Sequence, residues 1–466
     1  MKTATTIYTC TKCDAQSPKW TGQCLECGAW GTVAIGATST SGSGSGSSVR
    51  LSGQTSRHPG VPPAKPEHFD DIRSEDSVRL PIGIDELDRV FGGGIVPGSV
   101  TLVGGEPGIG KSTICLQVAV KISKNKKVIY ASGEESAAQV KSRAGRIGGG
   151  TNEMLFLGET EVETIIATLN HERPALAVID SVQMLRSSEI PAEAGAVSTI
   201  RGATAKLVEF AKRTSVPLIL VGHVTKDGNV AGPKTLEHLV DAVLSFEGER
   251  TGQLRLLRVL KNRFGSTDET GIFEMTGEGL KEITNPSAYM LEERNGSTPG
   301  DVVSCVLEGT RPVLVDIQAL VQPTSFGYPT RRATGFDQSR LEMLIAVLAA
   351  RGGLNLGQHD VFINVVGGLK IKDPSVDLAV LLALASAHSN QSLGDLVVWG
   401  EVGLGGEIRP VPATDRRLSE AARLGIKTAI TPLPRNKTSV RLKGDIEIRD
   451  VHTITEALTA VIKTKA

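Results

Sequence analysis

Apolar residues fall into short, nearly continuous runs between residues 99 and 262, and segments with helical spacing separate these runs. Such runs are typical of strands buried on both faces, and their alternation with helices predicts a parallel sheet covered on both sides. We expect strands in five segments: 99–105, 127–133, 175–181, 216–223 and 254–262. The pattern therefore indicates an α/β domain, which we place at residues 67–285.

The pattern changes after residue 285. Residues 302–322 read as a hairpin of two strands, and residues 337–353 read as a helix. The apolar segment 376–388 is shorter than the about 20 residues of a membrane span, and we interpret it as a buried helix. These elements predict a separate α+β domain at residues 286–466.

Two Cys-x-x-Cys pairs, Cys10/Cys13 and Cys24/Cys27, lie near the N-terminus. Each pair aims two sulfurs inward, and together they supply four thiolates for a tetrahedral Zn²⁺. Two disulfides are disfavoured in a reducing cytosol, and a redox pair would not need the second Cys-x-x-Cys. The spacing predicts a zinc ribbon at residues 1–35 that depends on its metal to fold.

A linker and two further cysteines complete this outline. Residues 36–66 are rich in Gly and Ser and then in Pro, which predicts a flexible tether. Cys115 and Cys305 lie in apolar surroundings, and we expect both to be inert core residues.

Composition limits the classes of partner. Lys plus Arg and Asp plus Glu number 51 each, so any basic surface must be local or must arise by assembly. The N-terminus carries cysteines and charges where a secretory signal would be apolar, and no run is long enough for a membrane span. We expect a cytoplasmic protein without a membrane partner.

A glycine-rich loop follows the first predicted strand and opens a helix. Its glycines let backbone N–H groups point inward, and the helix N-terminus adds a positive dipole, which together suit phosphate. Lys111 is expected to reach the β- and γ-phosphates, and the Ser112 hydroxyl to bind Mg²⁺. A fortuitous glycine loop would not have strand, loop, Lys-Ser and helix in this order. The expected ATP-binding residues are Gly105, Glu106, Pro107, Gly108, Ile109, Gly110, Lys111, Ser112 and Thr113.

Polar residues at the ends of the other strands complete the predicted site. Asp180 ends strand 175–181 and is placed to hold a water bound to Mg²⁺, although such residues often only cap a turn. Glu134 and Glu135 follow strand 127–133, and spacing does not decide which is the catalytic base or whether both are solvated. His223 is a candidate γ-phosphate sensor or, alternatively, a buried structural histidine.

Residues 80–113 and 130–136 resemble the RecA/KaiC/DnaB class of ATPases. Together with the four-cysteine ribbon and the string Lys261-Asn262-Arg263-Phe264-Gly265, they make the whole chain resemble the RadA (Sms) family of bacterial DNA repair proteins. The resemblance implies a RecA-like P-loop ATPase core and a hexameric ring. It further implies action on single-stranded or branched DNA beside a RecA-type recombinase.

The resemblance also implies a C-terminal domain similar to the proteolytic domain of Lon, which uses a Ser-Lys dyad. Ser375 matches the serine, and Asp415 stands where the lysine is expected. An aspartate does not supply the amine that would accept the serine's proton. The adjacent Arg416 and Arg417 stay protonated and cannot act as bases. We therefore expect a proteolytically inactive scaffold.

In RecA-like rings each nucleotide lies between subunits. Lys261 and Arg263, two residues apart on a predicted strand, share a face and are suited to reach a neighbour's transferring phosphoryl group. A surface ion pair or a DNA contact is the alternative. If the cations of one subunit contact the nucleotide of the next, the contact is head-to-tail, and its repetition closes into a ring or continues as a filament.

Loops after the predicted strands supply candidate DNA contacts, although each cation is as often solvated. Because these loops lack aromatic residues, we expect salt-sensitive, sequence-independent binding to backbone phosphates. The candidates are Arg186, Arg201, Lys226 and Lys234.

The predicted function is a DNA-dependent ATPase, a ring-forming, helicase-type motor for branch migration in recombinational repair. A KaiC-like signalling ATPase that does not act on DNA is the alternative, and the zinc ribbon and the Lys-Asn-Arg-Phe-Gly string disfavour it. An ATP-dependent protease is disfavoured by Asp415.

Overall fold

The computed structural model describes most of the chain in long segments: 78–148, 153–190, 193–222, 236–248, 253–292, 298–325, 327–433 and 446–462. It also describes the N-terminal segments 8–10, 16–17, 19–24 and 29–35, and the single residues 68, 150 and 294. The chain divides into two compact units, Met1–Ile72 and Arg73–Ala466.

The first unit is a small antiparallel sheet. Strand β1 (Tyr8–Cys10) pairs with β2 (Gln16–Ser17) on one side and with β3 (Val33–Ile35) on the other. The side chains of Cys10 and Cys24 are buried.

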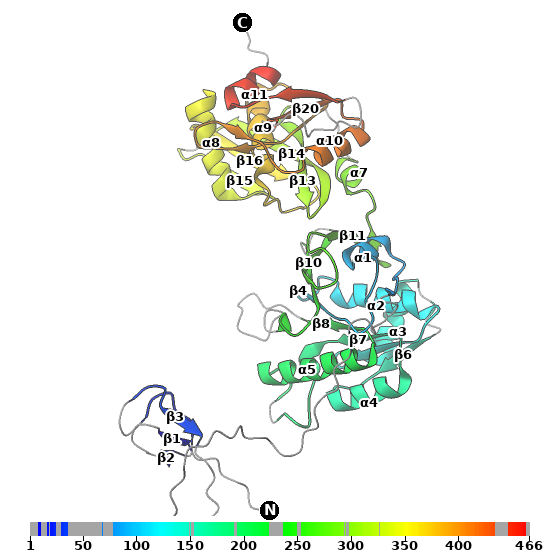
Figure 1. The fold of residues 1–466 in the computed structure, drawn as a ribbon. Coiled ribbons are helices and arrows are strands. Elements are labelled where there is room, and N and C mark those ends of the chain that lie inside the picture. The colour runs from blue at the N-terminus through cyan, green and yellow to red at the C-terminus, as the bar shows by residue number, and fades with distance from the viewer. Residues whose placement is uncertain are drawn as a thin grey trace, which may run out of the picture. The chain divides into compact units, whose positions relative to one another are not determined.

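The second unit begins with a nine-stranded sheet, ordered β12-β11-β10-β9-β4-β8-β7-β5-β6. We call residues 78–283, which form this sheet and its helices, the nine-stranded body (Figure 1). Its strands are β4 (Val100–Gly105), β5 (Val128–Ser132), β6 (Met154–Leu157), β7 (Leu176–Asp180), β8 (Leu218–Val221), β9 (Ala242–Glu247), β10 (Leu254–Asn262), β11 (Thr270–Thr276) and β12 (Gly279–Glu282).

Strands β4 to β9 are parallel, as the hydrophobic pattern predicts. Strand β10 differs from our expectation, because it runs antiparallel to both β9 and β11. Only six residues separate Glu247 from Leu254, which is too short for the crossover that a parallel pair requires.

Helices cover both faces of this sheet. The apolar sides of α2 (Lys111–Ser123) and α3 (Ala137–Arg146) contribute to one buried cluster, whereas those of α4 (Val162–Glu172) and α5 (Val197–Thr214) contribute to another. A short helix, α1 (Asp85–Val90), packs against β11, and a 3₁₀ turn, η3 (Val182–Met184), follows β7. The carboxyl ends of the parallel strands meet at one edge of the sheet, where a site can form.

Residues 286–462 form the seven-stranded body, with sheet order β15-β16-β14-β13-β17-β20-β21. Its strands are β13 (Asp301–Glu308), β14 (Arg311–Pro323), β15 (Arg331–Thr334), β16 (His359–Val365), β17 (Leu396–Val398), β20 (Thr428–Thr431) and β21 (Glu447–Asp450), with a separate pair β18 (Glu401–Val402) and β19 (Ile408–Arg409). Its helices are α7 (Pro286–Leu291), α8 (Gln338–Gly352), α9 (Asp377–Ser389), α10 (Thr414–Arg423) and α11 (Ile454–Val461), with a 3₁₀ turn η4 (Pro374–Val376).

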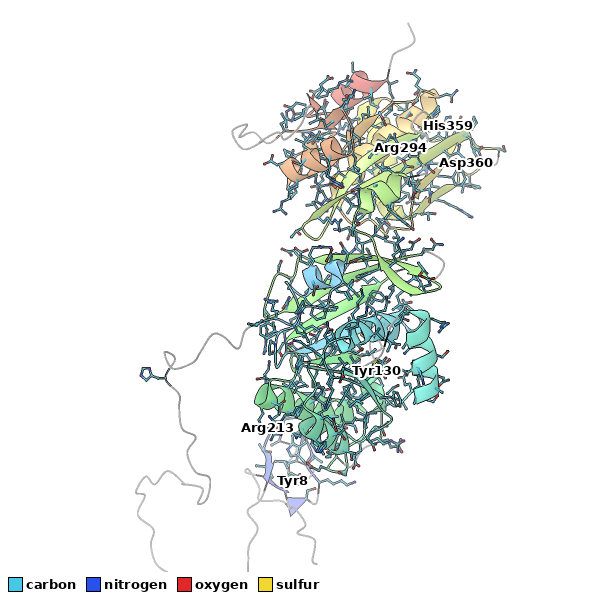
Figure 2. The ribbon with its side chains drawn as sticks, turned by 90° about the vertical axis from the view of Figure 1, so that its right-hand side faces the viewer. Tyr8, Tyr130, Arg213, Arg294, His359 and Asp360 are labelled. Carbon is cyan, nitrogen blue, oxygen red and sulfur yellow. The ribbon has the colours of Figure 1, made fainter. Side chains whose placement is uncertain are left out.

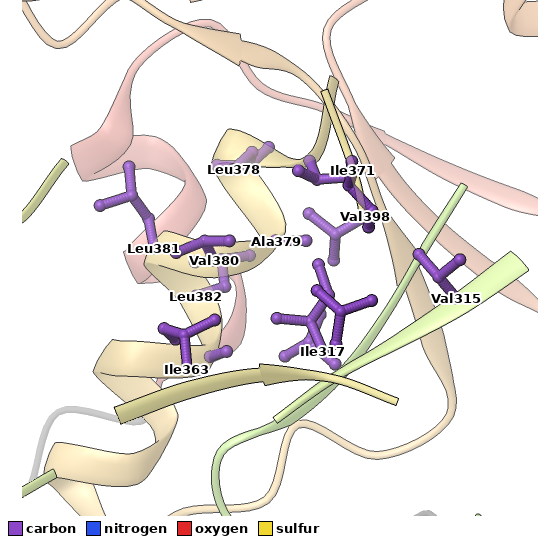
Figure 3. Packing of buried hydrophobic residues seen from close by; sticks show 14 of the residues in the cluster. Val315, Ile317, Ile363, Ile371, Leu378, Ala379, Val380, Leu381, Leu382 and Val398 are labelled. Atoms are coloured by element: carbon purple, nitrogen blue, oxygen red, sulfur yellow. The ribbon is translucent and has the colours of Figure 1, made fainter. Parts of the chain in front are cut away.

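The hairpin predicted at 302–322 and the helices predicted at 337–353 and 376–388 are confirmed by β13–β14, α8 and α9. Helix α9 is buried on nearly all sides, and Figure 3 shows its residues Leu378 to Leu382 in one buried cluster with Val315, Ile317 and Ile363 of the sheet. A helix buried on all sides loses its amphipathic pattern, which explains the continuous apolar run.

Strand β10 joins the two bodies, because alternate residues face different cores. Leu254 and Leu256 pack into the cluster of the seven-stranded body, while Leu257 and Val259 pack into that of α2. None of the helices described in the structure combines the length and apolar character that a membrane crossing requires.

Candidate nucleotide site

Strand β4 ends at Gly105, and α2 begins at Lys111, so the loop between them lies at the helix N-terminus. Gly108 and Gly110 have φ values of 78° and 115°, a region that suits glycine. A Cβ on Gly105 would lie 2.5 Å from the backbone oxygen of Phe246. The loop conformation therefore requires glycine, and it leaves the first N–H groups of α2 available to an anion.

Lys111 is only 3% exposed. Its Nζ donates to the backbone oxygens of Gly105 and Glu106, both at 2.9 Å. Burial lowers the pKa of Lys111, and the nearby carboxylates of Asp180 and Glu134 oppose that change. The Lys111 amine is therefore held by the backbone of the loop, and the carboxylates of Asp180 and Glu134 lie near it.

Asp180 ends β7 and is buried. Tyr130, inside the nine-stranded body in Figure 2, donates its hydroxyl to Oδ2 of Asp180 at 2.5 Å. The other oxygen, Oδ1, is buried and has no hydrogen-bond partner among the described residues. A buried carboxylate oxygen requires a donor or a cation, so this oxygen fits a magnesium ion or its bound water.

The two glutamates after β5 have different partners. Ser181, next to Asp180, donates its hydroxyl to Glu134. Arg143 of α3 donates to both carboxylate oxygens of Glu135. The charge of Glu134 is among those that oppose the lowering of the Lys111 pKa by burial. The geometry therefore separates two residues that the sequence leaves equivalent.

A cavity of about 570 Å³ opens beside the loop. Gly105, Glu106 and Ile109 form part of its wall, and residues 368–373 of the seven-stranded body line another part. Buried Arg255 donates from Nε to the backbone oxygen of Ile109 at 3.0 Å, which fixes the loop to β10.

Lys261 and Arg263 lie at the other end of the sheet. Asn262 is level with Ala242, which is level with Thr101, whereas the phosphate loop starts four residues further along β4 at Gly105. That offset is about 13 Å along the strand, and the two-strand separation of β10 from β4 adds about 10 Å sideways. Neither cation can reach the phosphate loop of its own chain.

Strand β10 ends at Asn262 and its pairing with β9 shifts between Val259 and Lys261, so Arg263 lies one residue beyond the strand that we expected to carry both cations. Lys261 Nζ donates to the backbone oxygens of Glu237 at 2.5 Å and Val240 at 2.8 Å. Burial and the Arg263 charge lower the pKa of Lys261. Arg263 is 56% exposed and pairs with Asp241 at 3.3 Å, so it is the freer of the two.

Family models match two parts of the chain: an AAA domain at residues 63–229 and a rubredoxin metal binding domain at residues 8–34. A protein named DNA repair protein RadA from Pseudomonas aeruginosa is 46% identical over 438 residues, covering 93% of this chain and 94% of its own length. Its namesake from Bacillus subtilis is 43% identical and covers 97% of both chains.

The chain belongs to the RadA family. Among solved structures, a KaiC-like protein from Pyrococcus horikoshii matches 44% of this chain and 99% of its own, with 19% identity and a TM-score of 0.38.

Several residues predicted from the sequence have positions apart from the nucleotide loop. Arg186 is exposed in the segment after β7, and Arg201 is exposed on α5. Cys115 and Cys305 are buried, as predicted; burial raises the pKa of both thiols, that of Cys305 to about 12. The remaining predicted residues His223, Lys226, Lys234, Cys13 and Cys27 lie outside the described residues.

The RadA-family chain differs from our expectation at Ser375. Arg417, and not Asp415, is the α10 side chain that contacts it: Arg417 Nη1 donates to Ser375 Oγ at 3.0 Å. Arg417 also donates to the backbone oxygen of Cys305 and pairs with Asp373 at 3.0 Å. Ser375 and Arg417 are almost completely buried. The α10 side chain bonded to the Ser375 hydroxyl is therefore a guanidinium and not a carboxylate.

Sequence reasoning missed the residues that orient the site. Tyr130, Arg143 and Ser181 hold the acids, and Asp241 holds Arg263. Register supplies one usable signal: Tyr130 is level with Val178, two residues before Asp180, so both polar side chains share a sheet face.

Proposed function

We propose that this protein is a DNA-dependent ATPase of recombinational DNA repair that works as a hexameric, helicase-type ring. The observation that carries the proposal is the separation of Arg263 and Lys261 from the phosphate loop of their own chain. A cation that is exposed and cannot serve its own site is suited to serve a neighbour's. Family membership supports the repair role, because the relatives are named DNA repair proteins.

In the proposed reaction, backbone N–H groups of residues 105–113 and the Lys111 amine bind the phosphates. Ser112 and Asp180 would hold Mg²⁺, which neutralises charge on the phosphates when bound. Glu134 orients the attacking water and accepts its proton, since Arg143 occupies Glu135. His223 keeps its predicted role as a γ-phosphate sensor.

Arg263 of one subunit stabilises charge at the nucleotide of the next. Lys261 has a supporting role, because its amine caps two backbone oxygens and thereby fixes the segment that carries Arg263. A cation supplied across an interface contributes roughly 10³–10⁵ in rate in related reactions. Repetition of this contact gives a closed ring.

The proposed substrate is single-stranded or branched DNA, processed by branch migration beside a RecA-type recombinase. Arg186 lies in the segment that follows β7, whose carboxyl end carries Asp180, and exposed Arg201 lies on the next helix, α5. With Lys226 and Lys234 they would bind backbone phosphates around a ring, which reconciles DNA binding with zero net charge.

The other two domains complete the proposal. Residues 1–35 bind structural Zn²⁺ through Cys10, Cys13, Cys24 and Cys27, and the 36–66 linker tethers them to the ATPase domain at 67–285. Buried Cys10 and Cys24 fit this role, and no disulfide involves any of the described cysteines. Residues 286–466 form a Lon-like domain without peptidase activity, because Arg417 cannot activate Ser375.

Mixed rings test the trans-acting role. Arg263→Ala retains an intact nucleotide loop, and Lys111→Ala retains an intact Arg263, so mixtures contain interfaces with both functional halves. We expect each variant alone to be nearly inactive, with ATP affinity of Arg263→Ala near normal, and the mixture to recover part of the rate.

Arg213→Ala is the control, since this exposed arginine, labelled in Figure 2, lies in the last turn of α5. Backbone hydrogen bonds from Gly98 to Ser215 and from Arg263 to Asp241, which itself bonds to Val100, place both arginines near the start of β4. It should retain the wild-type rate. A mixture that recovers nothing, or a large loss of ATP affinity in Arg263→Ala, contradicts a trans-acting role.

A further inference from the structure

The tip of the β13–β14 hairpin, residues 308–311, contacts the nine-stranded body through each of its side chains. Glu308 pairs with Arg258 of β10 at 2.6 Å. The Thr310 hydroxyl donates to Glu269 at 2.9 Å. Arg311 donates from Nη1 to Glu86 at 2.8 Å and from Nη2 to the backbone oxygen of Thr284. This hairpin tip therefore holds two bodies together by specific polar contacts.

The backbone of the hairpin tip makes an even closer contact. Gly309 has a φ of 68°, and a Cβ at this position would lie 1.8 Å from the backbone oxygen of Asp268. No side chain fits between two backbones at that distance. The tip therefore rests directly on the segment between β10 and β11.

That segment, residues 263–269, begins with Arg263 and ends with Glu269, and we call it the arginine loop. Its two ends are fixed by different groups: Arg79 donates to the backbone oxygen of Phe264 at 2.6 Å, and Arg89 pairs with Glu269 at 2.5 Å. The hairpin tip adds a support between them, at Asp268, and a second bond to Glu269.

Burial strengthens these contacts. Glu308 is 6% exposed and Glu86 is 4% exposed, so an unpaired charge at either would be costly. Glu86 accepts from Arg89, Arg311 and the Ile272 backbone N–H at once, so its position depends on both bodies. A shift of the hairpin tip would change the contacts at Asp268 and Glu269 of the arginine loop.

We propose that the β13–β14 hairpin tip is a positioning element for the arginine loop, through which the seven-stranded body sets the reach of Arg263 toward the neighbouring subunit's nucleotide. This inference rests on the proposed trans-acting role. Misplacing a catalytic group by 1 Å can cost about 10²-fold in rate, so small movements of the tip suffice to control hydrolysis. Gly309, Thr310 and Arg311 are positioning residues, since they would act through Asp268, Glu269 and Glu86.

Gly309→Ala tests the inference in the full-length protein, because the added Cβ must displace Asp268. Gly394→Ala is the matched control: its φ is 76°, but no atom lies within 4 Å of the added Cβ. Thr310→Val, which keeps the shape and removes the bond to Glu269, is a milder second variant if Gly309→Ala fails to fold.

We expect Gly309→Ala to lower kcat for ATP hydrolysis tenfold or more while leaving the KM for ATP near normal, and Gly394→Ala to match the wild type. Because the defect lies in the half that serves the neighbour, Gly309→Ala should recover activity when mixed with Lys111→Ala and should not recover when mixed with Arg263→Ala. Thr310→Val should show the same pattern of recovery in mixtures, with a smaller loss of kcat. A merely destabilised fold would not produce this selective recovery.

Hydrogen exchange tests the positioning role of the hairpin tip separately from the trans-acting role of Arg263. We expect faster exchange of the amides at 263–270 in Gly309→Ala than in Gly394→Ala. Unchanged exchange, a wild-type kcat, or recovery with Arg263→Ala overturns the inference about the hairpin tip. Failure of the Arg263→Ala and Lys111→Ala mixture overturns the trans-acting role itself, whatever exchange shows.

Discussion

Replacing Arg417 by Met tests the account of the C-terminal domain at one buried side chain. Arg417 is 1% exposed and donates to Asp373, Ser375, and the backbone oxygens of Cys305 and Pro412. Methionine fills a similar volume but removes every one of these donors. Asp373 then remains beside the core without its cation.

The magnitude follows from the burial of the pair. Breaking a buried ion pair by removing one partner costs about 3–5 kcal/mol, and the 24% exposure of the Asp373 side chain places the effect near about 3 kcal/mol. For a body of this size that corresponds to a fall in melting temperature of roughly 6–12 °C. Arg416 is the control, because it is exposed and, among the described residues, donates to the backbone oxygen of Thr310 at 3.2 Å. Arg416→Met should change the free energy of unfolding by less than about 0.5 kcal/mol.

The pH dependence supplies an independent check. Burial alone would raise the pKa of Asp373, but the Ser375 backbone N–H and the Arg417 guanidinium together lower it. A carboxylate whose pKa is lowered on folding stabilises the protein above its unfolded pKa of about 3.9, and this stability is lost as pH falls through the folded pKa. The difference between wild type and Arg417→Met should therefore be largest at neutral pH and should shrink below about pH 4.

Differential scanning calorimetry of the wild type and both variants at pH 7 and at lower pH measures this. An unchanged melting temperature for Arg417→Met at pH 7, or a difference that stays constant to low pH, would refute the reasoning. The same proteins, incubated with casein and ATP, should show no peptide cleavage, because Ser375 is buried and without a base.

Three further predictions address the other sites. Glu134→Gln should lower the steady-state ATPase rate about 10²-fold or more, while Glu135→Gln should lower it much less because Arg143 engages that carboxylate; the reverse order would show that the base is misassigned. Cys24→Ser should release zinc and leave the calorimetric transition of residues 73–466 unchanged, while Cys115→Ser retains zinc; metal analysis that finds equal zinc in both contradicts the ribbon site. Burial, Asp301 and its hydrogen bond raise the pKa of Asp316 to about 8 beside Arg294 (Figure 2), so folding favours the protonated acid, and the wild type should lose stability as pH rises from about 4 to 8. Asp316→Asn should remove this loss, and parallel melting-temperature curves for the two proteins would count against it.

Local patterns made much of the nucleotide site predictable. The loop from Gly105 to Thr113 is one continuous segment between a predicted strand and a predicted helix, and β4 and α2 confirm that place in the fold. Asp180 and Glu134 could be named as candidates because the carboxyl ends of parallel strands meet at one edge of the sheet. Choosing Glu134 over Glu135 requires knowing where Arg143 and Ser181 lie, and both contacts depend on tertiary packing.

The errors have physical causes that a single sequence does not reveal. Asp415 and Arg417 are two residues apart on α10, which is a rotation of about 200°, so only one of them can face the core. The length of a strand does not reveal its direction, so the antiparallel course of β10, which carries Lys261 to the far end of the sheet, was missed. The contact of Gly309 with Asp268 joins two domains and leaves no local pattern.

The central claim is that ATP hydrolysis by this protein depends on DNA and drives its action on DNA. The most direct measurement is the steady-state ATPase rate of the full-length protein with and without single-stranded DNA of mixed sequence, with Lys111→Ala as the background. We predict a several-fold stimulation that is independent of base sequence and declines with rising salt, because the candidate contacts are to backbone phosphates. An identical rate with and without DNA, at a salt concentration where the wild-type protein is active, would contradict the account.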